Sequence, residues 1–219
     1  MRAFAHLFCK VPKIMRKKHI AEKKLYFLMN KAPGTVCSTV SDSHKTVYET
    51  FPEEILVSPE GAKLHTVGRL DCDTEGLLLL TNDGKLSNFL TRPESKIQKT
   101  YLAELEFPVS RQNQQEYARQ SKAGLVLPAE KKFPEQKSGG AEIQWLSDKK
   151  CTITLTEGKF HEVKRIFLAL GNRVLFLKRI KMAGLTLDEN LPSGAWRSLT
   201  EEEIFALKSQ QPDFVPSGL

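Results

Sequence analysis

The residues best suited to carry out a reaction lie in one short segment, Gly68-Arg69-Leu70-Asp71-Cys72-Asp73-Thr74-Glu75-Gly76. This polar loop is bounded by glycines and is followed at once by the apolar run Leu77–Leu80. A carboxylate held at the end of a buried strand can act as a nucleophile or a general base without a cofactor. Acidic residues are also common in ordinary solvated turns. The residues alone therefore leave both interpretations of Asp71 open.

Asp71-Cys72-Asp73 also has the spacing of an Asp-x-Asp metal or phosphoryl-transfer site. A magnesium site would need further oxygen ligands, and no other acidic cluster stands out in the sequence. The 4 cysteines are far apart and form no Cys-x-x-Cys pair, so they indicate neither a zinc site nor a disulfide framework. A metal-dependent phosphatase or nuclease is thus the weaker alternative, and it predicts an activity that chelators abolish.

A cluster of basic residues lies between residues 159 and 181, which contain seven Lys or Arg residues and one acid, Glu162. Such clustering indicates phosphate contacts, although an ordinary solvated helix face gives the same pattern. In a helix over 161–170, Lys164 flanks the apolar stripe, whereas Arg165 points roughly away from it. We therefore expect Lys164 to reach inward and Arg165 to meet solvent or RNA.

The elements that must position these residues are strands and helices in irregular order, which favours an α+β fold. Apolar or alternating runs predict strands over 25–29, 35–40, 64–70, 77–81, 100–107, 141–145, 151–156 and 174–180. Helices are expected over 85–91, 110–121, 161–170 and from Thr200 to about 208. Residues 128–140, rich in proline, glycine and charge, are expected to form a surface loop.

The charge of the chain is unevenly distributed. The formal net charge of the 219 residues is +7, and residues 1–24 alone hold eight basic residues and one acid. We expect residues 1–24 to be a flexible, salt-sensitive RNA tether, 25–208 to be the folded domain, and 209–219 to be a tail. No apolar run approaches the roughly 20 residues that span a bilayer, and the first segment lacks a signal-peptide core. We therefore expect a cytoplasmic protein.

The stretch from Gly68 to Gly84, GRLDCDTEGLLLLTNDG, closely resembles the signature of RsuA-type ribosomal RNA pseudouridine synthases. Three further stretches agree in order, NKAPG at 30–34, KTY at 99–101 and EGKFHEVKRIF at 157–167, as does the region 184–204. The resemblance covers nearly all of residues 25–208. It implies the pseudouridine synthase fold, with a mixed, largely antiparallel central sheet in two subdomains, flanking helices and a catalytic cleft.

The resemblance implies a cofactor-free isomerase that converts a specific uridine of ribosomal RNA to pseudouridine. Asp71 matches the catalytic aspartate that initiates cleavage of the base–sugar bond. Arg69 matches the residue that holds the flipped nucleotide, Tyr101 the one against the uracil, and Lys164 the basic partner of the aspartate. Further RNA contacts are expected at Lys159, His161, Arg165, Lys178 and Arg179.

Two departures from the family bear on the substrate. Glu162 stands where the family usually has glutamine, and only 24 residues precede the core where the family normally has an RNA-binding module. We expect a monomer acting on ribosomal RNA or an assembling ribosomal particle; a separate recognition partner is an open alternative. Small-subunit RNA is favoured over large-subunit RNA. A catalytically silent ribosome-assembly factor is the competing class, which the retention of Asp71, Tyr101 and Lys164 disfavours.

Overall fold

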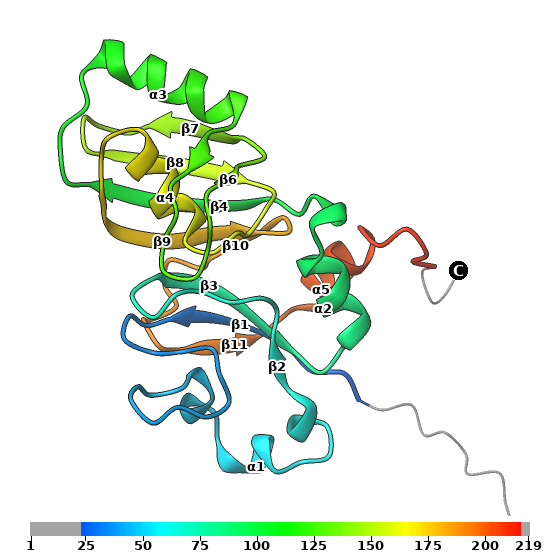
Figure 1. Cartoon of the computed structure of the whole chain (residues 1–219). Helices are drawn as coiled ribbons and strands as arrows, with labels where there is room; N and C mark the ends of the chain where they lie inside the picture. The colour runs from blue at the N-terminus through cyan, green and yellow to red at the C-terminus, as the bar shows by residue number, and fades with distance from the viewer. Residues whose placement is uncertain (1–22, 216–219) are drawn as a thin grey trace, which may run out of the picture.

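The structure, a computed structural model, describes residues 23–215, and its centre is a nine-stranded mixed sheet (Figure 1). The main strand order is β11-β1-β3-β9-β4-β8-β7, with β2 paired to β3 and β10 paired to β9. The strands of this sheet are β1 (Tyr26–Lys31), β2 (His65–Thr66), β3 (Glu75–Thr81), β4 (Lys99–Leu105), β7 (Ala141–Trp145), β8 (Lys150–Leu155), β9 (Val174–Met182), β10 (Leu185–Thr186) and β11 (Trp196–Ser198). A separate pair is formed by β5 (Val126–Leu127) and β6 (Gln136–Lys137). The predicted largely antiparallel α+β architecture is confirmed.

Five α-helices of the described residues flank the sheet. They are α1 (Glu53–Leu56), α2 (Gly84–Thr91), α3 (Arg111–Ala123), α4 (Glu162–Ala169) and α5 (Glu201–Lys208). The predicted caps are present, because Ser110 accepts a hydrogen bond from the Asn113 amide and Thr200 forms a capping box with Glu203. Figure 1 shows α3 along β7 at one end of the molecule and α1 at the other. None of the helices within 23–215 is long and apolar enough to cross a membrane.

Two halves of the sheet meet at a short parallel contact between β3 and β9. Within the described chain every other strand pair is antiparallel, whereas here Glu75 lies opposite Lys178 and Gly76 opposite Arg179. Gly76 has a φ of +100°, and a Cβ atom there would lie 2.3 Å from the carbonyl oxygen of Arg179. Glycine is therefore required at the point where the loop carrying Asp71 enters the sheet.

The run Leu77–Leu80 shows why β3 is buried on both faces. Leu78 and Leu80 pack into one hydrophobic cluster, and Leu77 and Leu79 pack into another. Successive side chains of a strand point to opposite faces, so a strand covered on both faces is apolar at successive positions. The loop of Asp71 is thus attached to one of the most deeply buried elements of the fold.

Two strand predictions are wrong. Residues 35–40 form no strand, and Val36 makes a single bridge to Thr46. The reason is that both edges of β1 are already paired, one with β3 and the other with β11. The stretch 64–70 forms a strand only at His65–Thr66. The prediction for residues 1–24 lies outside the described residues, apart from 23 and 24.

Candidate active site

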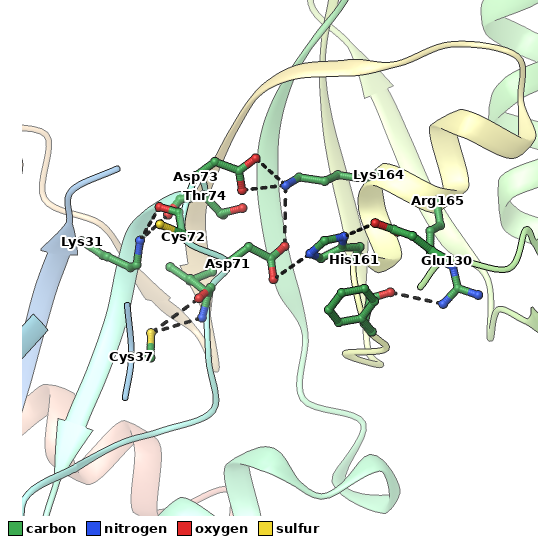
Figure 2. Close-up of polar contacts among 12 residues, drawn as sticks. Lys31, Cys37, Asp71, Cys72, Asp73, Thr74, Glu130, His161, Lys164 and Arg165 are labelled. Atoms are coloured by element: carbon green, nitrogen blue, oxygen red, sulfur yellow. Dashed lines mark hydrogen bonds and ion pairs between the residues drawn. The ribbon is translucent and has the colours of Figure 1, made fainter. Parts of the chain in front are cut away.

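The loop that carries Asp71 is fixed by a buried lysine. Lys31 is 0% exposed, and its Nζ donates to the carbonyls of Cys72 at 3.2 Å and Thr74 at 2.9 Å (Figure 2). It also donates to the carbonyl of Ala32 at 3.1 Å. Burial lowers the pKa of Lys31 below its usual value. A lysine has three N–H donors, so three carbonyls satisfy it fully. Lys31 therefore holds the backbone on both sides of Asp73 in place.

The turn that follows β1 supports the same loop from a second side. The Gly34 amide donates to the Cys72 carbonyl at 2.8 Å. The Leu70 amide donates to the Cys37 sulfur at 3.5 Å, and the Cys37 thiol lies 3.6 Å from the Leu70 carbonyl. The stretches 30–34 and 68–76, which are separate in the sequence, thus form one supporting unit around Asp71.

Lys164 reaches this loop from α4, as its place beside the apolar stripe predicts. Its Nζ lies 3.8 Å from Oδ2 of Asp71 and donates to the two carboxylate oxygens of Asp73 at 2.6 and 2.7 Å. Burial alone would raise the pKa of Asp73, but the hydrogen bonds and charge of Lys164 outweigh this effect and lower it. The structure therefore brings Lys164 to Asp71 as predicted, with Asp73 as a second partner that the sequence did not indicate.

His161, predicted as an RNA contact, lies on the other side of Asp71. Its Nε2 is 3.6 Å from Oδ1 of Asp71, while its Nδ1 lies 2.8 Å from Oε1 of Glu130 (Figure 2). Asp71 thus has a lysine at one carboxylate oxygen and a histidine at the other. Glu130 comes from the segment that the sequence analysis treats as a plain surface loop, and nothing in its sequence surroundings marks it.

These residues border a cavity of about 500 Å³. A volume of this size is in the range of small-molecule sites and accommodates a nucleoside. Tyr101, 9% exposed and located on β4, lines the cavity together with Arg69. Phe133 and Phe160 add aromatic surface, which sequence reasoning also missed. The polar and aromatic side chains around the cavity include Arg69, Asp71, Tyr101, Lys132, Phe133, Lys159, Phe160, His161 and Lys164.

A smaller cavity of about 270 Å³ shares Arg69, Tyr101 and Lys159 with the first and adds Lys99 and Arg179. Burial lowers the pKa of Lys99, and the nearby charge of Arg179 lowers it further. The Arg179 side chain, 2% exposed, donates through Nε to the Leu77 carbonyl at 2.7 Å. One of its terminal nitrogens is buried without a partner among the described residues. Arg179 therefore belongs to the floor of this cavity and not to an open surface.

Arg165 does not face solvent, and this prediction is wrong. The side chain is 1% exposed and donates to the carbonyls of Pro128 at 2.9 Å, Pro134 at 2.9 Å, Leu127 at 3.4 Å and Phe160 at 3.2 Å. Helical geometry placed it correctly away from the apolar stripe, but the segment 127–134 folds over that face of α4. Because these guanidinium hydrogen bonds all go to backbone oxygens, Arg165 holds the segment against the helix.

The remaining predicted contacts differ in their surroundings. Lys159 forms an ion pair with Glu157 and lines both cavities. Lys178 is half-buried on β9 and lines neither cavity. Glu162, at the position of the usual glutamine, is 5% exposed and accepts a hydrogen bond from the Lys159 amide at 2.9 Å. Burial raises the pKa of Glu162.

Comparison with known proteins identifies the family. The family model described as RNA pseudouridylate synthase matches residues 25–169. The chain belongs to this family. Ribosomal small subunit pseudouridine synthase A of Salmonella typhimurium is 42% identical over 179 residues, which cover 82% of this chain and 72% of that protein. The enzyme of the same name from Escherichia coli K12 is 41% identical, with the same coverage of both chains.

Solved structures agree with the family assignment. A crystal structure of a pseudouridylate synthase superimposes with a TM-score of 0.74 and 40% identity, covering 85% of this chain and 74% of that chain. A Cbf5-Nop10-Gar1 complex contains a chain that is 19% identical, with a TM-score of 0.51 over 76% of this chain and 52% of that chain. The second likeness concerns the fold alone. The resemblance noted in the sequence and the pseudouridine synthase fold it implied are confirmed.

Proposed function

We propose that this protein isomerises a specific uridine of ribosomal RNA to pseudouridine, with small-subunit RNA as the substrate. Family membership supports the chemistry, and the names of the relatives with 41–42% identity support the choice of RNA. The proposed enzyme acts as a monomer in the cytoplasm on RNA or on an assembling particle. No resident cofactor is included in this proposal, because side chains of the chain itself can carry every step.

The observation that carries the proposal is the placement of Asp71. Its carboxylate borders the larger cavity, held on a loop that Lys31 fixes, with Lys164 at 3.8 Å and His161 at 3.6 Å. The ionised form of a carboxylate is the form able to attack carbon or accept a proton. Asp71 is therefore the residue that we assign to the first step.

The reaction itself exchanges one glycosidic bond for another. The bond between N1 of uracil and C1′ of ribose breaks, the base turns, and a bond forms between C5 and C1′. C5 then loses its proton and N1 gains one, so that atoms and charge balance without an oxidant or reductant. Asp71 starts the cleavage, by attack or by proton abstraction at the ribose, and Tyr101, which lines the same cavity, lies against the base.

The smaller cavity offers a place for the RNA backbone beside the target nucleotide. Lys99 and Arg179 lie close enough for the charge of one to lower the pKa of the other, and neither forms an ion pair with a carboxylate within residues 23–215. Buried cations are normally paired, and an RNA phosphate supplies the missing negative charge. Arg69, shared by both cavities, is placed to hold the uridine out of the base stack, a step that costs a few kcal/mol.

Mapping of pseudouridine in ribosomal RNA tests the proposal. Cells that lack the gene should lose one modified site, which the wild-type protein restores and Asp71→Asn does not. With purified protein and RNA, the rate of Asp71→Asn should fall by roughly 10³-fold, whereas Asp42→Asn, a change at a carboxylate outside both cavities, should act like wild type.

Three outcomes contradict the proposal. Equal restoration by wild type and Asp71→Asn would exclude Asp71 as the reacting carboxylate. An unchanged pseudouridine map in the deletion strain would leave an RNA-binding role without turnover as the better description. Loss of activity in a chelator, reversed by added magnesium, would favour the metal-dependent alternative. A lost site in the large-subunit RNA would correct the substrate and leave the chemistry in place.

A further inference from the structure

The backbone of the segment that carries Glu130 is held by hydrogen bonds within the segment and from α4. Glu130 and Phe133 exchange two backbone hydrogen bonds of 2.9 Å, and β5 and β6 pair on either side of them. Arg165 binds the carbonyls of Pro128 and Pro134, one on each side of the turn. The backbone of Glu130 is therefore fixed relative to α4, the helix that begins at Glu162 directly after His161.

The ring of His161 is held from several directions. It stacks on Phe160 with ring centroids 3.8 Å apart and planes 18° apart, and Phe160 stacks on Phe133 at 4.0 Å and 11°. The backbone of His161 has a φ of +49°, in the left-handed region that residues other than glycine rarely occupy. Such conformations persist where the surroundings enforce them, and they concentrate at functional sites.

The hydrogen bond between Glu130 and His161 decides which ring nitrogen faces the reaction. A carboxylate can only accept, so the 2.8 Å contact places the proton of the neutral ring on Nδ1. Nε2, the other ring nitrogen, then points to Asp71, 3.6 Å away. This distance is longer than a hydrogen bond, as is common in sites that close only around substrate.

We propose that Glu130 is a positioning residue, which fixes the ring orientation and tautomer of His161 so that Nε2 faces Asp71 and the reacting nucleotide. The proposal rests on the isomerase function proposed above. At this position Nε2 is the group that can take up or return a proton beside the reacting carboxylate. The charged groups that contact the ring or line the same cavity are Arg69, Asp71, Asp73, Glu130, Lys132, Lys159, Glu162 and Lys164.

Two substitutions of Glu130 test whether its carboxylate positions the ring. In Glu130→Gln the amide can accept from Nδ1–H or donate to Nδ1, so it no longer fixes one tautomer, whereas Glu130→Ala removes the hydrogen-bond partner. In single-turnover assays with saturating RNA, we expect both variants to be roughly 10- to 100-fold slower, by analogy with the loss when the carboxylate partner of a metal-binding histidine is removed. RNA affinity should be unchanged in both. Glu135→Ala, in an exposed residue of the same segment, is the matched control.

Nitrogen NMR of the His161 ring supplies a readout that does not depend on turnover. At a pH where the ring is neutral, wild type should show the Nδ1–H tautomer, and Glu130→Gln and Glu130→Ala should each show a mixture. The resonance is assigned from its absence in His161→Gln. A full rate in Glu130→Ala, or an unchanged tautomer in both variants, would overturn the proposal. A wild-type protein that forms no pseudouridine would instead refute the proposed function, while the NMR comparison would still test Glu130.

Discussion

The loop 68–76 and the segment 127–134 provide two walls of the cavity at Asp71, and each is held by one buried cation that binds backbone carbonyls. Lys31 makes two such hydrogen bonds to the loop and a third to Ala32, and Arg165 makes three to the segment and a fourth to Phe160. Neither forms an ion pair with a carboxylate among the described residues. In both walls a positive charge therefore organises the chain instead of contacting substrate.

The difference between the walls lies in what else supports them. The loop 68–76 continues into β3, which is buried on both faces, and receives further hydrogen bonds from Gly34 and Cys37. The segment 127–134 contains two prolines, Pro128 and Pro134, which have no N–H to donate, and its flanking strands β5 and β6 have two residues each. The second wall thus depends more on its single arginine for its structure. The first wall carries Asp71, so we expect changes in its backbone to affect the reaction rate more.

Among changes in the two walls, Lys31→Met should have the largest effect on stability and on the single-turnover rate. The change removes the Lys31 donor from three carbonyls, but the Gly34 amide still donates to Cys72 and the Thr35 hydroxyl to Ala32, so the Thr74 carbonyl is the one that loses its donor. This loss costs about 2 kcal/mol and lowers Tm by roughly 4–8 °C. Because it shifts the loop of Asp71, we expect the single-turnover rate to fall by about 100-fold, measured well below the variant's Tm. Lys45→Met, in an exposed lysine of the same half, serves as the control. Lost stability with a full rate would show that the loop keeps its geometry without Lys31.

A smaller effect on activity should follow from Arg165→Lys. Lysine retains the charge but lacks the planar fork that reaches carbonyls on both sides of the turn. We expect proteolysis within residues 127–134 to become about 10-fold faster and the single-turnover rate to fall by a similar factor. The salt dependence of RNA binding should not change, whereas Arg173→Lys, in an exposed arginine, should alter neither proteolysis nor rate. A flatter salt dependence in Arg165→Lys would instead mean that Arg165 contacts RNA, as its sequence position suggested.

The smallest effect concerns Glu162, beside both walls on α4. Burial raises the pKa of Glu162 above its value in the unfolded chain, so its contribution to stability is complete at low pH and declines as pH rises through the folded-state pKa. Glu162→Gln keeps an oxygen to accept from the Lys159 amide and removes the titration. We expect a Tm gain of about 2–4 °C at neutral pH that vanishes toward pH ~4. In thermal scans across this range, a gain that is independent of pH would contradict the assigned cause, and Glu142→Gln, at an exposed position, should show none.

The sequence by itself determined the parts of the protein that depend on local pattern. The complete burial of Leu77–Leu80, the caps at Ser110 and Thr200, and the inward position of Lys164 follow from local composition, the periods of strands and helices and short-range hydrogen bonding. The loop around Asp71 was recognisable for the same reason, because its chemistry and its attachment to a strand lie within one continuous stretch. Family, fold and chemistry could all be predicted from such stretches.

Only the tertiary structure decided which distant segments complete the site. Glu130 lies 31 residues before His161, and the pairing depends on how 127–134 folds over α4. The same fold turned Arg165 inward, since its buried position is set by carbonyls that no helical period describes. The unpaired stretch 35–40 had strand-like residues but no free edge of β1 to join. In each case the outcome depends on which backbone groups remain available for hydrogen bonding after other segments have packed. A local sequence pattern does not predict this.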